Sequence, residues 1–296
     1  MNRFERLFAE HKIVLGDGAM GTMLQRLGLT TGGAPELWNV EAPEKVKQVH
    51  QGYVDAGSMI ITTNSFGGTR FRLALHKLEE RVAELNRAAA QIAREVAGDR
   101  VAVAGSMGPT GELLEPLGTL TFDEAKAAFA EQAAALAEGG VDFLLIETMS
   151  DLNEVRAAVE GAREGTGGSL PIAVTMTFDT RGHTMMGVSP EQALKAIYEM
   201  GIRYIGSNCG NGPEETIGAI EKMAAIKPDD VILIAQSNAG IPRWQKGGEI
   251  VYDGTPEVMA EYAVRVRDLG ARYIGACCGS TPEHIRAMAR ALGIGR

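Results

Sequence analysis

Short apolar runs recur at intervals along the whole chain. Each run is rich in leucine or β-branched residues and does not alternate with polar positions. This pattern is typical of parallel strands that are buried on both faces. Strands are therefore predicted over IVLG (13–16), MIITT (59–63), VAVAG (101–105), FLLIE (143–147), IAVTM (172–176), YIGSN (204–208), VILIA (231–235) and YIGAC (273–277).

Longer stretches with apolar residues at helical spacing separate these runs, and several of them end at glycine. Ser189 and Thr255 each precede a proline, which is typical of an N-cap followed by the first helical residue. The predicted helices cover residues 43–57, 79–98, 123–140, 151–162, 189–201, 213–225, 255–270 and 281–293.

The alternation of strands and helices predicts a (β/α)8 TIM barrel. A doubly wound parallel sheet is the alternative arrangement of the same units. No proline- or serine-rich linker divides the chain, so we expect a single domain over residues 1–296.

An internal repeat favours the barrel. Residues 201–214 (GIRYIGSNCGNGPE) and 270–283 (GARYIGACCGSTPE) share nine of fourteen positions and relate the sixth unit to the eighth. A looser form of the pattern reaches back to earlier strands. It places a set of polar side chains in one layer on alternate strands of a barrel. These are Asn64, Glu147, Asn208 and Cys277.

Composition narrows the function classes. The formal net charge of −9 argues against nucleic-acid binding, which usually needs a basic face. No apolar run approaches the roughly 20 residues of a membrane helix, and the charged N-terminus lacks the apolar core of a signal peptide. We therefore expect a cytoplasmic protein without a membrane partner. Thiols stay reduced in that compartment, so clustered cysteines indicate metal binding or catalysis.

All three cysteines of the chain, Cys209, Cys277 and Cys278, lie in the repeat at equivalent strand ends. Three thiolates would bind Zn²⁺ and leave its fourth position open, as in catalytic zinc sites. Such a site carries a net charge of about −1, which favours activation of a thiol over activation of water. Two alternatives remain open at this point: buried cysteines with a chance neighbour, or a vicinal redox pair at Cys277–Cys278.

Two acidic residues also lie at predicted strand ends. Asp17 and Glu147 could bind a substrate ammonium group, and the backbone N–H groups of Gly18, Ala19 and Met20 could bind a carboxylate. Together they could hold an amino acid. Alternatively, the two acids serve as turn and helix-start residues, or form an acid–base pair of the glycosidase kind.

His76 and His183 are other possible ligands or bases. We interpret His76 as part of a helix and His183 as a loop residue, both without a role in the chemistry.

Several motifs, spread over essentially the whole chain, resemble the homocysteine S-methyltransferase family. The resemblance is closest to the homocysteine-binding domain of cobalamin-dependent methionine synthase. The motifs are GDGAMGT (16–22), TNSFGG (63–68), GSMGP (105–109), ETMSD (147–151), SNCG (207–210) and GACCG (275–279).

This resemblance implies a (β/α)8 barrel whose zinc is held by Cys209, Cys277 and Cys278. It implies that homocysteine binds the zinc as a thiolate, accepts a methyl group and becomes methionine. Residues matching Asp17, Glu147 and the Gly18–Met20 backbone hold its amino and carboxyl groups. Asn208 and Asn238 match polar positions near the zinc, and we expect both to help bind the substrate.

The expected methyl donor is a methylcorrinoid, so cobalamin is implied on a partner domain or protein. The chain stops just after the last predicted helix, so we expect either one module of a longer methionine synthase or a chain served by a separate corrinoid protein. One alternative is a demethylase that passes a methyl group from another substrate to a corrinoid protein. Another is a non-catalytic zinc- or thiol-binding module.

Overall fold

A computed structural model describes residues 2–30, 32–244 and 250–294. Its centre is an 8-stranded parallel sheet in the order β1-β10-β7-β6-β5-β4-β3-β2. Each of these strands coincides with one of the predicted apolar runs to within three residues at either end. They are β1 (Val14–Leu15), β2 (Ile60–Thr62), β3 (Ala102–Met107), β4 (Phe143–Met149), β5 (Ile172–Met176), β6 (Tyr204–Cys209), β7 (Ile232–Ser237) and β10 (Ala271–Ala276).

The two ends of this strand order meet, so the sheet is a nearly closed barrel. The Met59 N–H, just before β2, donates to the Leu15 carbonyl of β1 at 2.8 Å. The Thr62 N–H of β2 donates to the Asp17 carboxylate at 2.7 Å. An open doubly wound sheet would leave its first and last strands apart. The prediction of a (β/α)8 barrel is therefore confirmed.

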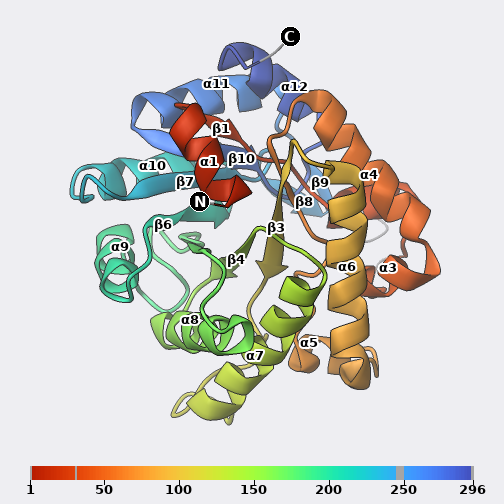
Figure 1. Ribbon diagram of the computed structural model, residues 1–296. Helices are drawn as coiled ribbons and strands as arrows, with labels where there is room; N and C mark the ends of the chain where they lie inside the picture. The colour runs from red at the N-terminus through yellow and green to blue at the C-terminus, as the bar shows by residue number, and fades with distance from the viewer. Residues whose placement is uncertain (1, 31, 245–249, 295–296) are drawn as a thin grey trace.

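Helices surround the barrel (Figure 1). Those predicted from periodicity are all present, with ends that shift by a few residues. Ser189 and Thr255 cap their helices as predicted, by accepting the N–H groups of Gln192 and Val258. The helices are α4 (Pro43–Ala56), α6 (Val82–Ala97), α7 (Phe122–Glu138), α8 (Leu152–Thr166), α9 (Pro190–Glu199), α10 (Pro213–Ala224), α11 (Pro256–Asp268) and α12 (Pro282–Ala291).

Several shorter elements were not predicted. They are α1 (Arg3–Glu10), α2 (Gly21–Arg26), η1 (Pro35–Leu37), α3 (Trp38–Glu41) and α5 (Arg70–Ala74). All but α1 are too short to give a periodic signal. The first turn of the predicted 79–98 helix is a 3₁₀ helix, η2 (Glu79–Arg81). His76, which we assigned to a helix, lies in the turn just after α5, and His183 lies in a loop as expected.

Helix α1 closes the amino-terminal end of the barrel. Its Phe4 ring stacks on Phe143 of β4, with 3.7 Å between the ring centroids, and also packs against Tyr204. Phe8 packs against Tyr204 and Tyr273. Burial of these rings is the main stabilising contribution of α1. Because this end is filled, the opposite end is the one that remains for a site.

A two-stranded hairpin, β8 (Pro242–Trp244) and β9 (Ile250–Tyr252), follows β7 and was also not predicted. Its Tyr252 ring lies against Gly279, where an added Cβ would come within 2.1 Å of the ring. The hairpin therefore packs on the segment that follows β10.

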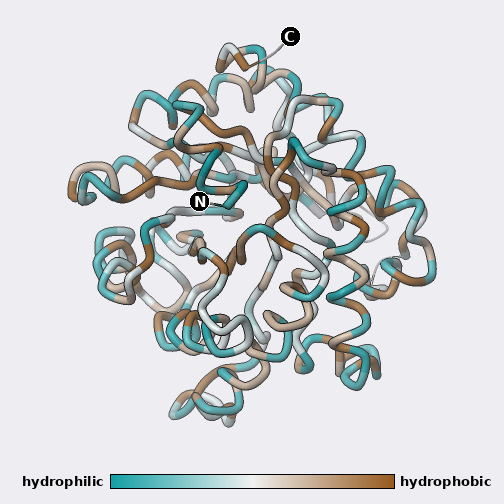
Figure 2. The backbone as a smooth tube through the Cα atoms, in the orientation of Figure 1, coloured by the Kyte–Doolittle hydropathy of each residue, from teal (hydrophilic) through white to brown (hydrophobic). Residues whose placement is uncertain are grey.

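Hydropathy follows the layers of the fold. Figure 2 shows hydrophilic and hydrophobic residues alternating along the outer helices, as expected for helices with one buried face. Among the described residues, no helix has the length and apolar character needed to cross a membrane.

Candidate active site at the carboxyl end of the barrel

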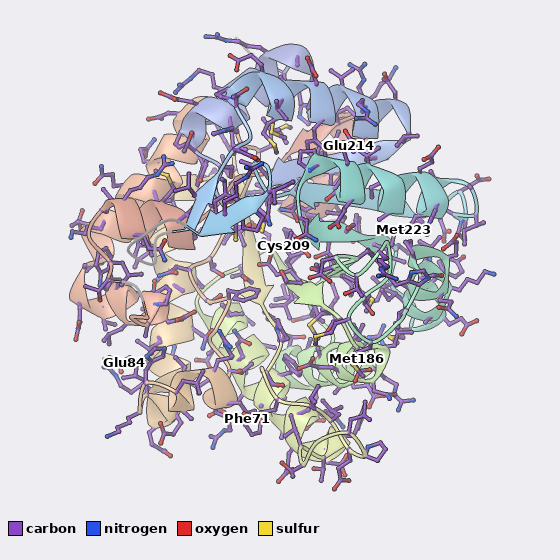
Figure 3. The ribbon with its side chains drawn as sticks, turned by 180° about the vertical axis from the view of Figure 1, so that it is seen from behind. Phe71, Glu84, Met186, Cys209, Glu214 and Met223 are labelled. Atoms are coloured by element: carbon purple, nitrogen blue, oxygen red, sulfur yellow. The ribbon has the colours of Figure 1, made fainter. Side chains whose placement is uncertain are left out.

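A cavity of about 450 Å³ lies at the carboxyl ends of the strands. In barrel enzymes this end carries the active site. Viewed from behind, the labelled Cys209 lies near the centre of the molecule, and Glu84 and Glu214 lie farther out (Figure 3). The cavity is lined by Asp17–Gly21, Gly32, Gly33, Pro35, Glu36, Thr62–Gly67, Arg72, His76, Ser106, Glu147, Thr148, Cys209, Gln236, Ala276, Cys277 and Cys278.

The three cysteines meet at one end of this cavity. Cys209 is the last residue of β6, and Cys277 and Cys278 directly follow β10. Strand β7 lies between them, because Cys209 pairs with Ser237 and Ser237 pairs with Ala276. The three sulfur atoms lie within 4.8 Å of one another, and the Sγ atoms of Cys209 and Cys277 are 3.0 Å apart. The sequence repeat therefore does bring all three thiols together.

The backbone at two residues beside the cavity has an unusual, left-handed conformation. Cys209 has φ +60, a left-handed conformation that costs energy for a residue with a side chain. Thr148, directly after Glu147, has φ +61. Both strained residues lie at the carboxyl ends of strands that reach the cavity, Thr148 within β4 and Cys209 as the last residue of β6. Such strain persists where the surrounding structure fixes it, as at functional sites.

The glycines that the two repeats share have a steric role. A Cβ at Gly206 would lie 1.8 Å from the Ile234 carbonyl oxygen, and one at Gly275 would lie 3.1 Å from the Asp17 carbonyl oxygen. Each glycine therefore allows its strand to approach a neighbour closely. This approach sets the ends of β6 and β10, and so the positions of the cysteines.

The charge of the cysteine cluster is concentrated on one thiol. Hydrogen bonds from the Cys209 and Cys277 thiols hold the pKa of Cys278 well below its usual range. Hydrogen bonds with Cys209 and Cys278, together with burial, raise the pKa of Cys277. A cluster with one ready thiolate and two thiol neighbours is what a soft cation would bind with release of protons.

The donor set fits zinc. Tetrahedral zinc with Zn–S bonds of about 2.3 Å places its sulfur ligands about 3.8 Å apart. The observed sulfur positions lie within 4.8 Å of one another, and all three cysteines are free. A vicinal disulfide between Cys277 and Cys278 would need an S–S bond of about 2.05 Å, and both cysteines are free. The donor set and spacing are therefore suited to a metal.

Asp17 and Glu147 lie beside the cysteines in the cavity wall. Thr62 donates to both carboxylate oxygens of Asp17, through its N–H at 2.7 Å and its hydroxyl at 2.9 Å. Glu147 accepts from the Ser106 hydroxyl. Burial raises the pKa of each acid to about 7, and the nearby Asp17 charge contributes to the shift of Glu147. Two such carboxylates favour a cationic ligand between them.

The backbone of Gly18–Met20 also lines the cavity, just before α2. The Ala19 N–H already donates to the Ser280 hydroxyl at 3.0 Å, and the Ala19 carbonyl accepts from Tyr53 at 2.7 Å. These bonds fix the turn. Because the Ala19 N–H is already used, only the N–H groups of Gly18 and Met20 in this segment could contact a ligand carboxylate. Carboxylate binding by the Gly18–Met20 backbone therefore stays a prediction for Gly18 and Met20.

Asn208 lies behind the cavity wall and is only 1% exposed. Its Oδ1 accepts from the Thr148 N–H and the Thr175 hydroxyl, both at 2.8 Å. Its Nδ2 donates to the Thr148 hydroxyl at 2.8 Å and lies 3.3 Å from a Glu147 oxygen. With these partners, Asn208 is placed to orient Glu147, and a contact between Asn208 and the substrate stays a prediction.

Asn238 lies close to the cysteines as expected, whereas Asn64 is placed differently from the expectation. Asn238 is buried, does not line the cavity, and donates to the Gly210 carbonyl beside Cys209. Asn64 lines the cavity but turns its amide to the Pro35 carbonyl and to Asn39. The expected layer of four side chains therefore holds for the Glu147–Asn208 contact, whereas Asn64 belongs to a neighbouring network.

Several cavity residues were not predicted from the sequence. Thr62 lies in a predicted strand and Ser106 in a family motif, but neither was assigned a role, because their partners lie about 40 residues away in the chain. Glu36 lies in a 3₁₀ turn with no periodic signal. Gln236 is a polar residue at the end of the apolar strand β7. A polar residue in such a strand could have been predicted to line a site.

Fold and site together define a (β/α)8 barrel with a thiol-rich centre at its mouth. A family model described as homocysteine S-methyltransferase matches residues 14–292. The methionine synthases of Mycobacterium leprae and Mycobacterium tuberculosis are each 33% identical over 95% of this chain. The chain belongs to the homocysteine S-methyltransferase family, so the resemblance seen in the sequence is confirmed. This chain spans 24% and 25% of the length of those two relatives.

Solved structures agree with the fold. The homocysteine methyltransferase MmuM from Escherichia coli, in its oxidized form, has a TM-score of 0.81 and 24% identity, covering 98% of this chain and 99% of that one. Its metallated form has a TM-score of 0.80 at the same identity and coverage. A methyltransferase from Methanosarcina mazei has a TM-score of 0.64 at 13% identity, with 98% of each chain covered.

Proposed function

We propose that this chain binds homocysteine in the cavity and that the homocysteine sulfur accepts a methyl group there, giving methionine. Membership of the homocysteine S-methyltransferase family supports methyl transfer to homocysteine. The observation that carries the residue-level proposal is the convergence of three cysteine sulfurs within 4.8 Å beside two buried carboxylates.

Cys209, Cys277 and Cys278 would hold a zinc ion. When bound, zinc stabilises a thiol as its thiolate near neutral pH and so makes its sulfur nucleophilic. The protein's own part is to bring three thiols to one point by means of Gly206, Gly275 and the left-handed Cys209 backbone.

Asp17 and Glu147 would bind the ammonium group of homocysteine. An ammonium group has three N–H donors and no acceptor, so it pairs well with two carboxylates. Thr62 fixes Asp17, and Ser106 and Asn208 fix Glu147. Because these partners are held in place by strands, the carboxylates need not reorganise when the ligand arrives. The Gly18 and Met20 N–H groups would bind its carboxylate.

The methyl group would come from a methylcorrinoid on a partner domain or protein. The methionine synthase relatives support this, since the chain matches about a quarter of their length and leaves room in them for further domains. The cytoplasmic setting stays a prediction.

The test is to replace Cys209 by serine and to measure zinc content and methyl transfer to homocysteine. A serine hydroxyl is not deprotonated at neutral pH, so we expect zinc content to fall and methyl transfer to drop by on the order of a hundredfold. Cys209→Asp is the matched variant, because aspartate tolerates the left-handed backbone and can ligate zinc. It should keep more zinc than Cys209→Ser. Full activity in Cys209→Ser would refute the proposal.

A further inference from the structure

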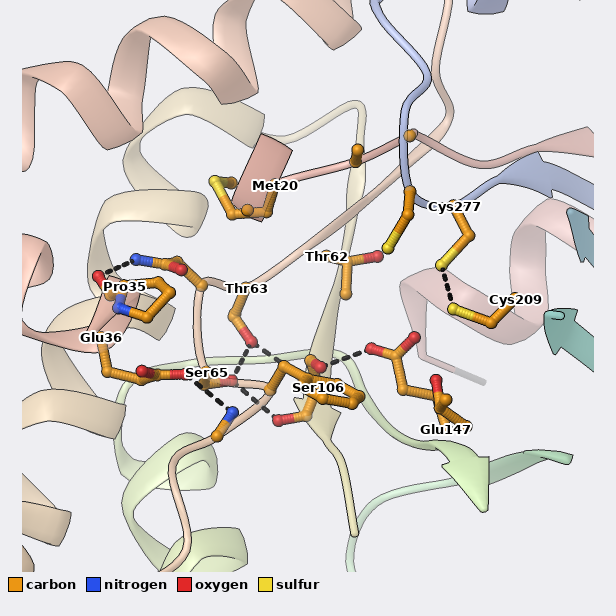
Figure 4. A pocket seen from close by; sticks show the side chains of 18 of the residues that line it. Met20, Pro35, Glu36, Thr62, Thr63, Ser65, Ser106, Glu147, Cys209 and Cys277 are labelled. Carbon is orange, nitrogen blue, oxygen red and sulfur yellow. Dashed lines mark hydrogen bonds between the residues drawn. The ribbon is translucent and has the colours of Figure 1, made fainter. Parts of the chain in front are cut away.

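The cavity is larger than its proposed acceptor substrate. Homocysteine has about eight non-hydrogen atoms, and at no more than about 30 Å³ each, the share of one water molecule, it would fill about half of the space. The cavity measures about 450 Å³. The cysteines lie at one end, and Glu36 and Pro35 lie at the other (Figure 4). The space that homocysteine would leave free extends towards Glu36 and Pro35, and we call this part of the cavity the outer compartment.

The wall of this outer compartment is built from two segments joined by hydrogen bonds. The Gly67 N–H donates to Glu36 Oε1 at 2.7 Å. Asn39 donates to the Asn64 carbonyl at 2.8 Å, and Asn64 donates back to the Pro35 carbonyl at 2.7 Å. These bonds join residues 35–39 to the turn at 64–67, and we call the joined pair of segments the clasp. The Glu36 and Asn39 side chains are 6% and 3% exposed, so these bonds are shielded from water.

The clasp places an aromatic side chain at the rim. Phe66, between the clasped residues, is 37% exposed, whereas Asp17 in the inner half is 3% exposed. The Phe66 ring packs on Gly108, where an added Cβ would lie 2.6 Å from it. The outer compartment is thus the side that meets solvent, and a methyl donor would enter from there.

Other contacts hold the turn from the barrel side. Gln132 donates to the Ser65 carbonyl at 2.8 Å, and Asn86 donates to the Gly68 carbonyl at 2.9 Å. These donors are neutral amides. In these bonds, Glu36 alone contributes a carboxyl group. Burial raises the pKa of Glu36, and its Oε1 can accept the Gly67 N–H in either protonation state. Removing this carboxyl group would loosen the outer half and leave the inner half intact.

We propose that the outer compartment receives the methyl-bearing face of the donor, and that Glu36 is a positioning residue that shapes it through Gly67. This inference rests on the proposed function. It divides the cavity into an acceptor half, with Asp17, Glu147 and the cysteines, and a donor half, with Glu36 and Phe66.

The experiment uses the zinc-loaded full chain, with homocysteine as acceptor and free methylcobalamin as donor. Homocysteine affinity is measured by calorimetry in the absence of donor, and kcat and KM for methylcobalamin are measured separately. For Glu36→Ala we expect homocysteine affinity within about twofold of wild type and kcat/KM for methylcobalamin lower by at least about tenfold. Glu36→Gln keeps an acceptor oxygen and should recover most of this loss.

Two further variants separate positioning from general destabilisation. Gly67→Ala would place a Cβ 3.0 Å from Glu36 Oε1, so it should shift the clasp and lower donor use without removing the carboxylate. Gly67→Ala also tests the role of the clasp if Glu36→Ala does not fold. Glu154→Ala is the matched control. Glu154 is another buried carboxylate that accepts a loop N–H, from Thr110 at 2.8 Å, but it does not line the cavity. Its loss should lower stability without changing the donor KM.

Equal weakening of homocysteine binding and donor use in Glu36→Ala would overturn the division of the cavity. So would unchanged use of methylcobalamin in both Glu36→Ala and Gly67→Ala. If wild type binds homocysteine and every variant behaves as wild type does, the result contradicts this inference and leaves the proposed function standing. A wild-type chain that neither binds nor methylates homocysteine refutes the proposed function as well.

Discussion

Asn208 at the end of β6 reaches across to Glu147 of β4, with its Nδ2 3.3 Å from the Glu147 Oε2. In the second copy of the sequence repeat the equivalent position is Cys277, a proposed metal ligand. The same strand-end position therefore serves two purposes. In one copy it supplies a sulfur, and in the other it orients the carboxylate proposed to bind the substrate.

Asn208→Ala should weaken homocysteine binding and leave zinc content unchanged. Loss of a hydrogen bond to a charged group is worth about 1.5–3 kcal/mol, so calorimetry should show affinity lower by about tenfold or more. Thr175→Val removes only one of the bonds to Asn208 and is the milder comparison. Loss of zinc with unchanged homocysteine affinity would contradict the assigned role.

Asp17 is expected to lower the stability of the metal-free chain at neutral pH. Burial raises its pKa from 3.8 to about 7, so the folded state holds the proton more tightly than the unfolded state. The stability that this provides is fully present below pH 3.8 and is lost as the pH rises to about 7.

Asp17→Asn removes this titration. Its stability advantage over wild type, measured by urea unfolding, should therefore grow by about 2–3 kcal/mol between about pH 5 and about pH 8. Homocysteine affinity should fall in the same variant. A stability difference that does not change with pH would mean that Asp17 is not desolvated in the folded chain.

The sequence was most informative where spacing alone determines position. The apolar runs predicted every barrel strand, and the repeat predicted the meeting of three thiols, because equivalent ends of strands in one barrel face the same mouth. The role of Asn208 could not be predicted, since its partner Thr148 adopts φ +61 and nothing in the sequence marks that residue as left-handed.

Short irregular elements were the other limit. Glu36 and Asn39 lie in one turn of 3₁₀ helix and one turn of α-helix, which are too short for a hydrophobic period. Their partners in the 64–67 turn are about 25–31 residues away. Helix α1 is amphipathic, but its apolar face packs into the barrel end, a contact that exists only once the barrel has formed.

Gly206→Ala tests why the repeats share a glycine. The new Cβ would lie 1.8 Å from the Ile234 carbonyl oxygen, so β6 and β7 would have to separate. We expect a loss on the order of 3 kcal/mol in the free energy of unfolding. Gly218→Ala is the control, because Gly218 lies in α10 with open space around it and alanine favours the helix by about 0.5–1 kcal/mol. A mild effect at Gly206 would refute the close approach of the strands.

His50 should make the fold sensitive to acid. It is fully buried in α4, and both ring nitrogens lack a hydrogen-bond partner among the described residues. Burial lowers its pKa from 6.5 to about 4. The unfolded state therefore binds the proton more tightly, and stability present above pH 6.5 is lost as the pH falls towards about 4.

The variant His50→Leu tests this. Between about pH 8 and about pH 5, wild type should lose about 2 kcal/mol more than His50→Leu in urea unfolding. His11→Gln, at an exposed histidine, should behave as wild type. Equal acid sensitivity of wild type and His50→Leu would show that His50 is solvated.

The proposed function depends on three cysteines at the barrel mouth that hold a zinc ion and leave a place for the substrate sulfur. X-ray absorption at the zinc edge, on the zinc-loaded chain with and without homocysteine, tests it most directly. We expect three sulfur ligands without homocysteine and four with it. An unchanged sulfur count on addition of homocysteine would contradict this expectation.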